Sequence, residues 1–214
     1  MALSGGADSA CVLMLAAEHM GPENVLAVTC VNSHVFKYEI DNARRISELV
    51  GVEHREFTVN MPPEFFEPSD IRCYHCKRSI LSGIGIEGFD VLFDGTNADD
   101  DLDSRPGTKA LREFDVVSPL RELGLGKKYA LEKCAALDGV HFTVESCKAT
   151  RIKGHLTEEL MAKVETFEDA LRDSLPGIRF RVDKGFVEFK SPVTITEKDF
   201  KRINEIKRES HGAS

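Results

Sequence analysis

The stretch Ser4-Gly5-Gly6-Ala7-Asp8-Ser9 stands between a short apolar start and a long apolar segment that runs to Met20. Two adjacent glycines let the backbone turn tightly and approach a phosphate closely. The Ser hydroxyls and the free N–H groups at the start of a helix can then donate hydrogen bonds to that phosphate. For a lone Gly-Gly, an ordinary turn with a helix cap from Ser or Asp is the simpler explanation. The surrounding sequence decides between the two.

Alternating strands and helices are predicted downstream of this loop. Residues 8–20 are apolar almost all round, as in a buried helix, and Gly21-Pro22 ends the segment. We then expect strands at residues 24–31, 53–59, 89–93 and 116–117, and helices at residues 36–50, around Cys73 and Cys76, and at residues 127–137. This alternation predicts an α/β fold with a parallel sheet and helices on both faces. Ligands of such sheets bind beyond the carboxyl ends of the strands.

The pattern changes after Gly154. A long amphipathic helix is expected from Leu156 to Leu171, followed by two short strands on either side of Lys184-Gly185 and a charged helix from Glu197. A chain of 214 residues, 42% of them hydrophobic, can bury one substantial core and carry a small appendage. We therefore expect a main domain at residues 1–153 and a C-terminal α+β extension at residues 154–214 for substrate binding or assembly. Only Met1-Ala2-Leu3 precede the glycine loop, so the opening strand is very short or truncated.

Composition excludes several classes of partner. The formal charge of -8 and the pI near 5.4 disfavour sequence-independent binding to nucleic acid, which relies on clustered Lys and Arg. The longest apolar run, residues 10–17, is far below the roughly 20 residues that span a bilayer, and no cationic leader precedes it. We expect a cytoplasmic protein. Six cysteines in such a chain are interpreted first as metal ligands or redox groups rather than as a disulfide framework.

An acidic loop follows the expected strand at residues 89–93. It reads Asp94-Gly95-Thr96-Asn97-Ala98-Asp99-Asp100-Asp101, and five carboxylates lie between Asp94 and Asp103. An acidic surface turn is the alternative, since Asp, Gly and Asn are ordinary turn formers. Beside a polyphosphate site, however, these oxygens can hold Mg²⁺, and the backbone at Gly95-Thr96 can meet a nucleotide. The candidates for binding a nucleotide, which the resemblance described below implies to be ATP, are Ser4, Gly5, Gly6, Asp8, Ser9, Gly95, Thr96 and Asp100.

Three cysteines are candidates for chemistry. Cys73 and Cys76 have Cys-x-x-Cys spacing, which fits a redox pair, half of a zinc site or two ligands of an iron–sulfur cluster. Cys147, taken alone, is more simply a small buried hydrophobe. Its neighbours Lys148 and Arg151 would lower its thiol pKa and favour the thiolate, which is the form needed for attack and for iron ligation. Cys11 and Cys30 lie in apolar patterns and are assigned to the core.

Four arginines are candidates for binding a phosphate or carboxylate group of a substrate, because the planar guanidinium matches both geometries. They are Arg105, Arg151, Arg179 and Arg181. Arg179 and Arg181 alternate with apolar residues, so the outward face of a strand explains them equally well. Lys127-Lys128 are most simply the solvated face of a helix, and no role is assigned to them.

The string SGGxDS, here residues 4–9, is the signature of the PP-loop ATP pyrophosphatases, and the chain resembles this class. The resemblance implies a HUP-like fold and cleavage of ATP between the α and β phosphates. Further motifs are similar to those of the LarE family of sulfur insertases, and they occur in order over most of the chain. They are Arg72-Cys73-Tyr74-His75-Cys76-Lys77, residues 94–100, Arg105-Pro106-Gly107, Ser118-Pro119-Leu120 and Ser146-Cys147-Lys148-Ala149-Thr150-Arg151-Ile152.

This second resemblance implies adenylation of the carboxylates of a pyridinium dicarboxylate mononucleotide, followed by sulfur delivery that makes the thiocarboxylates of the nickel-pincer nucleotide cofactor. In some members one cysteine, matched here by Cys147, donates its own sulfur and becomes dehydroalanine. In others three cysteines hold a 4Fe-4S cluster, which implies Cys73, Cys76 and Cys147 here. The family usually reads Cys-Leu-Ala-Ser-Arg where this chain has Cys-Lys-Ala-Thr-Arg, so a subfamily with another substrate is an open alternative.

The leading hypothesis is an ATP-dependent, AMP- and pyrophosphate-forming sulfur transferase that uses ATP, Mg²⁺ and a 4Fe-4S cluster. Its partners would be a pyridinium mononucleotide and a sulfur donor, and we expect a homo-oligomer. A PP-loop tRNA thiolase is the first alternative, although the acidic charge speaks against it. A PP-loop amide ligase or synthetase would leave Cys147 unexplained, and a nucleotide-sensing module would need no reactive cysteines.

Overall fold

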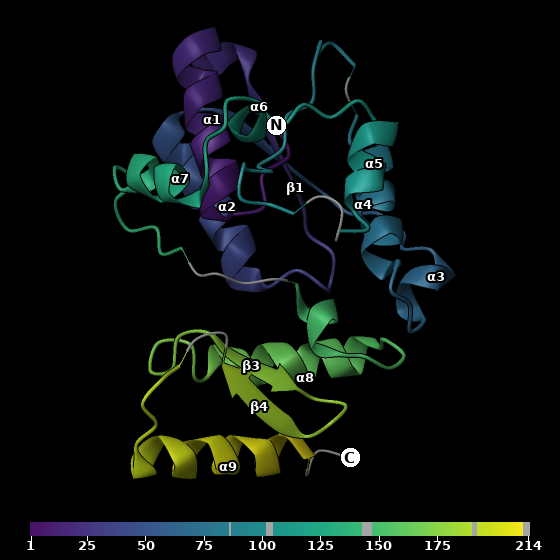
Figure 1. Ribbon diagram of the computed structural model, residues 1–214, viewed down its shortest axis with the longest axis vertical. Coiled ribbons are helices and arrows are strands. Elements are labelled where there is room, and N and C mark those ends of the chain that lie inside the picture. Colours follow the sequence, from purple (N-terminus) through teal and green to yellow (C-terminus); the bar gives the residue numbers. More distant parts are fainter. Residues whose placement is uncertain (86, 102–104, 143–146, 190–191, 212–214) are drawn as a thin grey trace. The chain divides into compact units, whose positions relative to one another are not determined.

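In the computed structural model, residues 1–85, 87–101, 105–142, 147–189 and 192–211 are described. Asp103 and Ser146, which belong to predicted motifs, lie outside the described residues. The chain forms two compact units. Unit 1 comprises Met1–Phe65 and Ser69–Phe142, and unit 2 comprises Phe66–Pro68 and Thr143–Ser214 (Figure 1). The division falls before the boundary expected at Gly154, so Cys147 and Arg151 belong to unit 2.

A parallel sheet forms the centre of unit 1. Strand β1 (Leu26–Cys30) pairs with β2 (Glu53–Phe57) in register from Leu26↔Glu53 to Cys30↔Phe57. On the other side of β1, Ala2 forms a parallel bridge with Val28. The buried hydroxyl of Thr29 donates to the carbonyl of Leu3 at 2.8 Å, which holds the same edge.

Two further short segments extend the sheet. The amide of Ala2 donates to the carbonyl of Phe93 at 2.8 Å, and Phe93 forms a parallel bridge with Val117. The order across the sheet is therefore β2, β1, Ala2, Phe93, Val117. The direction of this order reverses between Ala2 and Phe93, and ligands of open parallel sheets bind at such a switch point. The loops that begin at Ser4 and Asp94 leave the sheet at that position.

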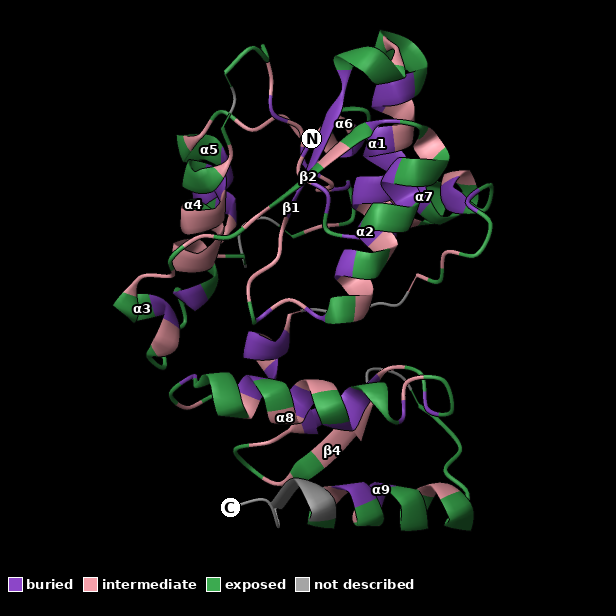
Figure 2. Ribbon diagram, turned by 180° about the vertical axis from the view of Figure 1, so that it is seen from behind, coloured by how far each residue is buried: buried purple, intermediate pink, exposed green. Residues whose placement is uncertain are grey.

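Helices cover this sheet on both sides. Figures 1 and 2 show α1, α2 and α7 on one side of the strands and α4 and α5 on the other. This confirms the predicted α/β fold, a parallel sheet between helices. The helices of unit 1 are α1 (Ala7–Met20), α2 (Lys37–Val50), α3 (Pro63–Phe66, whose last residue belongs to unit 2), α4 (Arg72–Gly83), α5 (Thr108–Glu113), α6 (Pro119–Glu122) and α7 (Lys127–Cys134), with a short 3-10 helix η1 (Pro22–Asn24).

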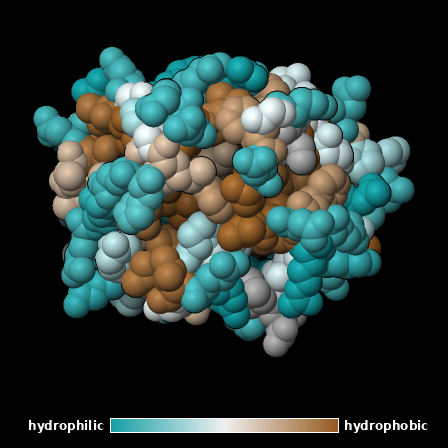
Figure 3. Space-filling view, turned by 90° about the horizontal axis from the view of Figure 1, so that it is seen from above, coloured by the Kyte–Doolittle hydropathy of each residue, from teal (hydrophilic) through white to brown (hydrophobic). Residues whose placement is uncertain are grey.

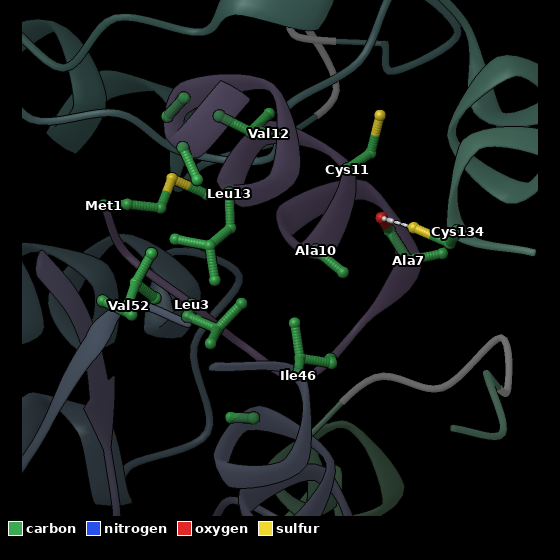
Figure 4. Close-up of a cluster of buried hydrophobic side chains, with 14 of the residues drawn as sticks. Met1, Leu3, Ala7, Ala10, Cys11, Val12, Leu13, Ile46, Val52 and Cys134 are labelled. Carbon is green, nitrogen blue, oxygen red and sulfur yellow. Dashed lines mark hydrogen bonds between the residues drawn. The ribbon is translucent and has the colours of Figure 1, made fainter. Parts of the chain in front are cut away.

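The core of unit 1 forms around α1. Figure 4 shows side chains from α1, the first residues, α2 and α7 pointing toward one another. Cys11 is fully buried, and the buried Cys134 donates its thiol to the carbonyl of Ala7 at 3.3 Å. Burial raises the pKa of Cys11 to about 11 and that of Cys134 to about 12. Both thiols are therefore core groups and not nucleophiles at neutral pH.

The predicted strand at residues 89–93 was only partly correct. Leu92 is buried and Phe93 forms the bridge to Val117, but Phe89 is 39% exposed and precedes the paired part. Gly88, with φ of 86°, makes a turn directly before it, which leaves only the last residues of the run in line with the sheet. The predicted strand at residues 116–117 is likewise reduced to the bridge at Val117.

Unit 2 contains the elements expected from the C-terminal sequence. Phe167 of α8 and Phe180 of β3 stack at 4.2 Å between ring centroids in its core. Thr157 caps α8 by accepting a hydrogen bond from Leu160 N at 3.1 Å. The elements are the 3-10 helix η2 (Lys148–Arg151), α8 (Glu158–Asp169), the antiparallel strands β3 (Ile178–Arg181) and β4 (Phe186–Phe189), and α9 (Glu197–His211).

Apolar side chains also reach the surface. The face shown in Figure 3 carries apolar patches that hydrophilic side chains separate from one another. Among the described residues, Leu123 is a large apolar side chain that is 68% exposed. In the part of the chain that the structure describes, no helix has the length and apolar character needed to cross a bilayer.

Candidate functional site

The glycine loop is held in shape by its own serines. The amide of Ser4 donates to Ser9 Oγ at 3.2 Å, and Ser9 Oγ donates to the carbonyl of Gly6 at 3.0 Å. Gly5 has φ of +81°, and a Cβ there would lie 2.0 Å from the carbonyl oxygen of Glu39. A Cβ on Gly6 would meet only Ser4 Oγ, at an ordinary 3.5 Å. Packing therefore requires glycine at position 5, whereas position 6 faces space that a ligand can use.

The loop that begins at Asp94 is fixed by that residue. Asp94 is 7% exposed and accepts hydrogen bonds from Thr96 Oγ1 at 2.7 Å and Ser118 Oγ at 2.7 Å. Lys77 Nζ lies 3.6 Å from Asp94 Oδ2. Gly95 packs against the start of α1, because a Cβ there would lie 2.6 Å from the amide nitrogen of Ser9. The two predicted loops are thus in direct contact at the switch point.

The other carboxylates of this loop also have partners within the protein. Asp99 Oδ2 accepts a hydrogen bond from Lys127 N, the first amide of α7, at 2.7 Å. Asp100 accepts from Asn97 N at 3.2 Å and forms an ion pair with Arg105 at 2.8 Å. Asp94, Asp99 and Asp100 therefore shape the loop, and Arg105 is brought to the same place as the ATP-binding candidates.

Asp8 differs from these carboxylates. Its Oδ1 is buried and has no hydrogen-bond partner among the described residues. Burial raises the pKa of Asp8, while the charge of Lys127 and a hydrogen bond from Asn97 oppose the rise. An unpartnered carboxylate oxygen beside a phosphate-binding loop fits a Mg²⁺ ligand, because this cation prefers oxygen donors and shares them with phosphates.

Helix α4 brings the Cys-x-x-Cys pair to the same edge of the sheet. Cys76 Sγ lies 3.4 Å from Nε2 of His34, which is 2% exposed and follows β1. His34 also packs on the ring of Phe65 at 5.0 Å. Cys73, one turn earlier, is exposed. His34 could not be singled out from the sequence, since a lone histidine in a loop has no informative spacing.

Cys147 stands at the start of η2 in unit 2. Its carbonyl accepts hydrogen bonds from the amide of Thr150 at 3.0 Å and from its hydroxyl at 2.8 Å. Lys148 Nζ pairs with Glu165 at 2.9 Å, and Arg151 forms a bidentate pair with Glu168 at 2.9 Å for each contact. The two cations that were expected to act on the Cys147 thiol are each neutralised by a carboxylate.

The unit 2 arginines lie close to one another. Arg181 of β3 hydrogen-bonds to the carbonyl of Thr150 and pairs with Glu188, and this contact lowers the pKa of Glu188. The charges of Arg179 and Arg151 act on Glu188 in the same direction. The side chain of Arg151 is 0% exposed, so its guanidinium serves the core of unit 2. Arg105 belongs to unit 1.

The predicted iron–sulfur ligands are divided between the units, with Cys73 and Cys76 in unit 1 and Cys147 in unit 2. Among the residues that the structure describes, no group of three or more His, Cys, Asp or Glu side chains is gathered for a metal ion. The described residues thus present no ready set of cluster ligands.

The chain is similar to several known proteins. The family model of asparagine synthase matches residues 1–77, which include the glycine loop, β1 and β2. A pyridinium-3,5-bisthiocarboxylic acid mononucleotide synthase of Lactiplantibacillus plantarum is 27% identical over 208 residues, which is 90% of this chain and 74% of that protein. An uncharacterised protein of Synechocystis is 32% identical over 133 residues, which is 59% of this chain.

The chain spans about half the length of the Synechocystis relative, 49%. Among solved structures, the NMN synthetase of Francisella tularensis superposes with a TM-score of 0.53 at 18% identity. This superposition covers 99% of the present chain and 84% of the synthetase. It supports the fold over nearly the whole chain.

Proposed function

Because the chain is a LarE-like PP-loop protein, we propose that it uses ATP to adenylate a carboxylate of a small pyridinium mononucleotide and then inserts sulfur, in nickel-pincer nucleotide cofactor synthesis. The observation that carries the proposal lies in unit 1. There the glycine loop and the Asp94 loop touch through Gly95 and Ser9, and Cys76 of α4 contacts His34 at the same edge of the sheet. The glycine loop and the thiols of α4 thus lie at the same edge of the sheet in unit 1.

Adenylation is the first step of the proposed reaction. A carboxylate oxygen of the substrate bonds to the α-phosphorus of ATP, while the bond from this phosphorus to the bridging oxygen breaks and its electron pair leaves with pyrophosphate. Gly6 leaves space for the phosphates, and Asp8 Oδ1 would hold the Mg²⁺ that offsets their charge. The loop has no lysine of the Walker A type, in keeping with cleavage at the α-phosphorus.

Sulfur transfer from Cys147 is the second step. The Cys147 thiolate attacks the carbonyl carbon, AMP leaves with the electron pair of the broken C–O bond, and a thioester forms. A base then takes the α-proton of Cys147, its electron pair forms the Cα–Cβ double bond, and sulfur departs from Cβ as the thiocarboxylate. The products are the thiolated substrate and dehydroalanine at position 147. A 4Fe-4S cluster held by Cys73, Cys76 and Cys147 is the alternative sulfur source, and no step is derived through it.

Substrate binding is assigned to the exposed Arg105 and to two partly exposed arginines of β3. Arg105 at the Asp100 loop and Arg179 and Arg181 on β3 would bind phosphate and carboxylate groups bidentately. The C-terminal region, residues 154–214, would serve substrate binding or assembly of a homo-oligomer. Arg151 is not included, because its guanidinium is buried against Glu168.

Intact mass and iron content after anaerobic preparation test the sulfur source. After one turnover with ATP, Mg²⁺ and the pyridinium dicarboxylate mononucleotide, wild type should lose the mass of H₂S from Cys147. Cys147→Ala should transfer no sulfur yet still release pyrophosphate, while Cys73→Ala and Cys76→Ala should retain a single turnover. If all three variants lose iron and sulfur transfer together, a cluster carries the sulfur instead. Normal transfer by all three variants would refute both mechanisms.

A further inference from the structure

Unit 2 contains two pairs of arginine and glutamate that differ in burial. The side chains of Arg151 and Glu168 are 0% and 2% exposed and form a bidentate contact. Those of Arg181 and Glu188 are 17% and 36% exposed. Separating the first pair would leave a buried charge uncompensated, which is costly. The second pair can open at small cost, because a partly exposed ion pair gains little over the contacts that each partner makes with water.

The register of the β3–β4 hairpin places Glu188 beside a second arginine. Residue 188 of β4 lies directly opposite Arg179 of β3, and Arg181 is the next residue on the same face of β3. Glu188 accepts a hydrogen bond from the Arg181 guanidinium, and this contact lowers the pKa of Glu188, so that the carboxylate is ionised at neutral pH. Two guanidinium groups and one carboxylate therefore share this face of the hairpin.

The Glu188 carboxylate has the same chemistry as the substrate groups assigned to this face. Carboxylate and phosphate oxygens compete for the same planar fork of guanidinium N–H donors. Both terminal nitrogens of Arg181 are already used within unit 2, since Nη1 donates to the carbonyl of Thr150 and Nη2 donates to Glu188 Oε1. A substrate anion that binds Arg181 bidentately must therefore replace Glu188.

We infer that Glu188 is an internal competitor, whose carboxylate occupies the anion site of Arg179 and Arg181 and leaves Arg181 when an organic phosphate or carboxylate binds. This inference rests on the substrate-binding role of the two arginines in the proposed function. The affinity for any anion is reduced by the fraction of molecules in which Arg181 is released. A ligand with a single weakly held anionic group is thus excluded, whereas a mononucleotide that carries a phosphate and carboxylates offsets the cost through its further contacts.

Calorimetric titration at constant ionic strength tests the competition, with inorganic phosphate and the pyridinium dicarboxylate mononucleotide as probes. Glu188→Gln keeps the size of the side chain but removes its charge, and it should raise the affinity for both probes by about three- to fivefold. Arg181→Met should lower both affinities by about tenfold or more, because it removes a charged contact. Glu159→Gln is the matched control in the same unit, because Glu159 forms an exposed ion pair with Lys163 on α8, and it should change neither affinity.

A double variant distinguishes displacement of Glu188 from simple repulsion of the ligand. In the Arg181→Met background, Glu188→Gln should raise the affinities by less than a factor of about two, since no contact with Arg181 remains to be broken. An undiminished gain in this background, or an equal gain from Glu159→Gln, would show a general effect of charge and overturn the inference. Glu188→Met provides a second neutral variant if Glu188→Gln does not fold.

The outcomes also separate the inference from the proposed function. If Arg181→Met loses affinity while Glu188→Gln binds no more tightly than wild type, the inference is wrong and the substrate site on β3 stands. If Arg181→Met binds both probes as wild type does, the substrate-binding role of β3 and the inference are both wrong. If neither wild type nor Glu188→Gln binds the mononucleotide, the proposed function itself is contradicted.

Discussion

Charged residues are used in opposite ways in the two units. In unit 2, Lys148 and Arg151 are buried and each is paired with a glutamate. In unit 1, Asp8 and Lys127 lie near one another, with a carboxylate oxygen and an ammonium that have no partner among the described residues. Buried charges that are fully paired hold a fold together, whereas unpaired charges beside the glycine loop can bind a ligand. Residue type alone does not distinguish the two uses.

The largest expected effect comes from breaking the pair in unit 2. Arg151→Met should lower the free energy of unfolding by about 3–5 kcal/mol, because it leaves the carboxylate of Glu168 buried and uncompensated. The double variant Arg151→Met/Glu168→Leu should recover much of this loss. The exposed pair of Arg45 and Glu48 is the control, and Arg45→Met should cost no more than about 1 kcal/mol. Urea denaturation provides the measurement, and equal effects of the two single variants would show that burial of the pair is unimportant.

Substitutions at the two glycines of the glycine loop should have different effects on stability and on ATP binding. Gly5→Ala should destabilise the protein by about 1–3 kcal/mol, since φ is positive and the new Cβ meets the carbonyl of Glu39. Gly6→Val should leave the unfolding free energy almost unchanged and abolish ATP binding, because its side chain fills the space assigned to phosphate. Thermal unfolding and calorimetry on both variants check this. A Gly6→Val protein that binds ATP normally would remove the loop from the site.

The smallest expected effect is the pH dependence of the stability difference between Asp8→Asn and wild type. Burial raises the pKa of Asp8 in the folded protein above its usual value of 3.8, so the ionised carboxylate destabilises the ligand-free fold. Asp8→Asn should therefore be slightly more stable than wild type at neutral pH. This difference should disappear as the pH falls through the raised folded pKa towards 3.8, since Asp8 then becomes protonated. The same variant should lose Mg²⁺-dependent ATP binding. A stability difference that grows at low pH would contradict the interpretation.

The architecture followed largely from local patterns. Glycines at 21 and 51 end α1 and α2 where expected, and Gly185 makes the turn between β3 and β4. The buried face of α2 follows helical spacing, with Ile40, Ala43 and Ile46. The strands near Phe93 and Val117 were predicted too long, because an apolar run does not show how many of its residues find a partner strand.

The side-chain contacts of the candidate site were harder to predict from the sequence. Lys127 and Lys128 are adjacent and chemically identical, and only the contact of residue 127 with Asp99, far away in the chain, separates them. The same holds for His34, whose contact with Cys76 depends on how α4 packs. We expected Lys148 and Arg151 to lower the thiol pKa of Cys147. The glutamates that pair with these two residues come from the next helix and could not be recognised from the sequence. Partners of this kind are set by tertiary structure.

Oxygen-isotope transfer tests the central claim most directly, that the protein activates a substrate carboxylate by adenylation before sulfur is inserted. The pyridinium dicarboxylate mononucleotide, labelled with oxygen-18 in its carboxylates, would be incubated with wild type, ATP and Mg²⁺, and the AMP analysed by mass spectrometry. The carboxylate oxygen bonds to the α-phosphorus and stays there when sulfur attacks the carbonyl carbon. We therefore predict AMP that carries one oxygen-18 atom, together with unlabelled pyrophosphate. Unlabelled AMP, or ADP as the nucleotide product, would contradict the account.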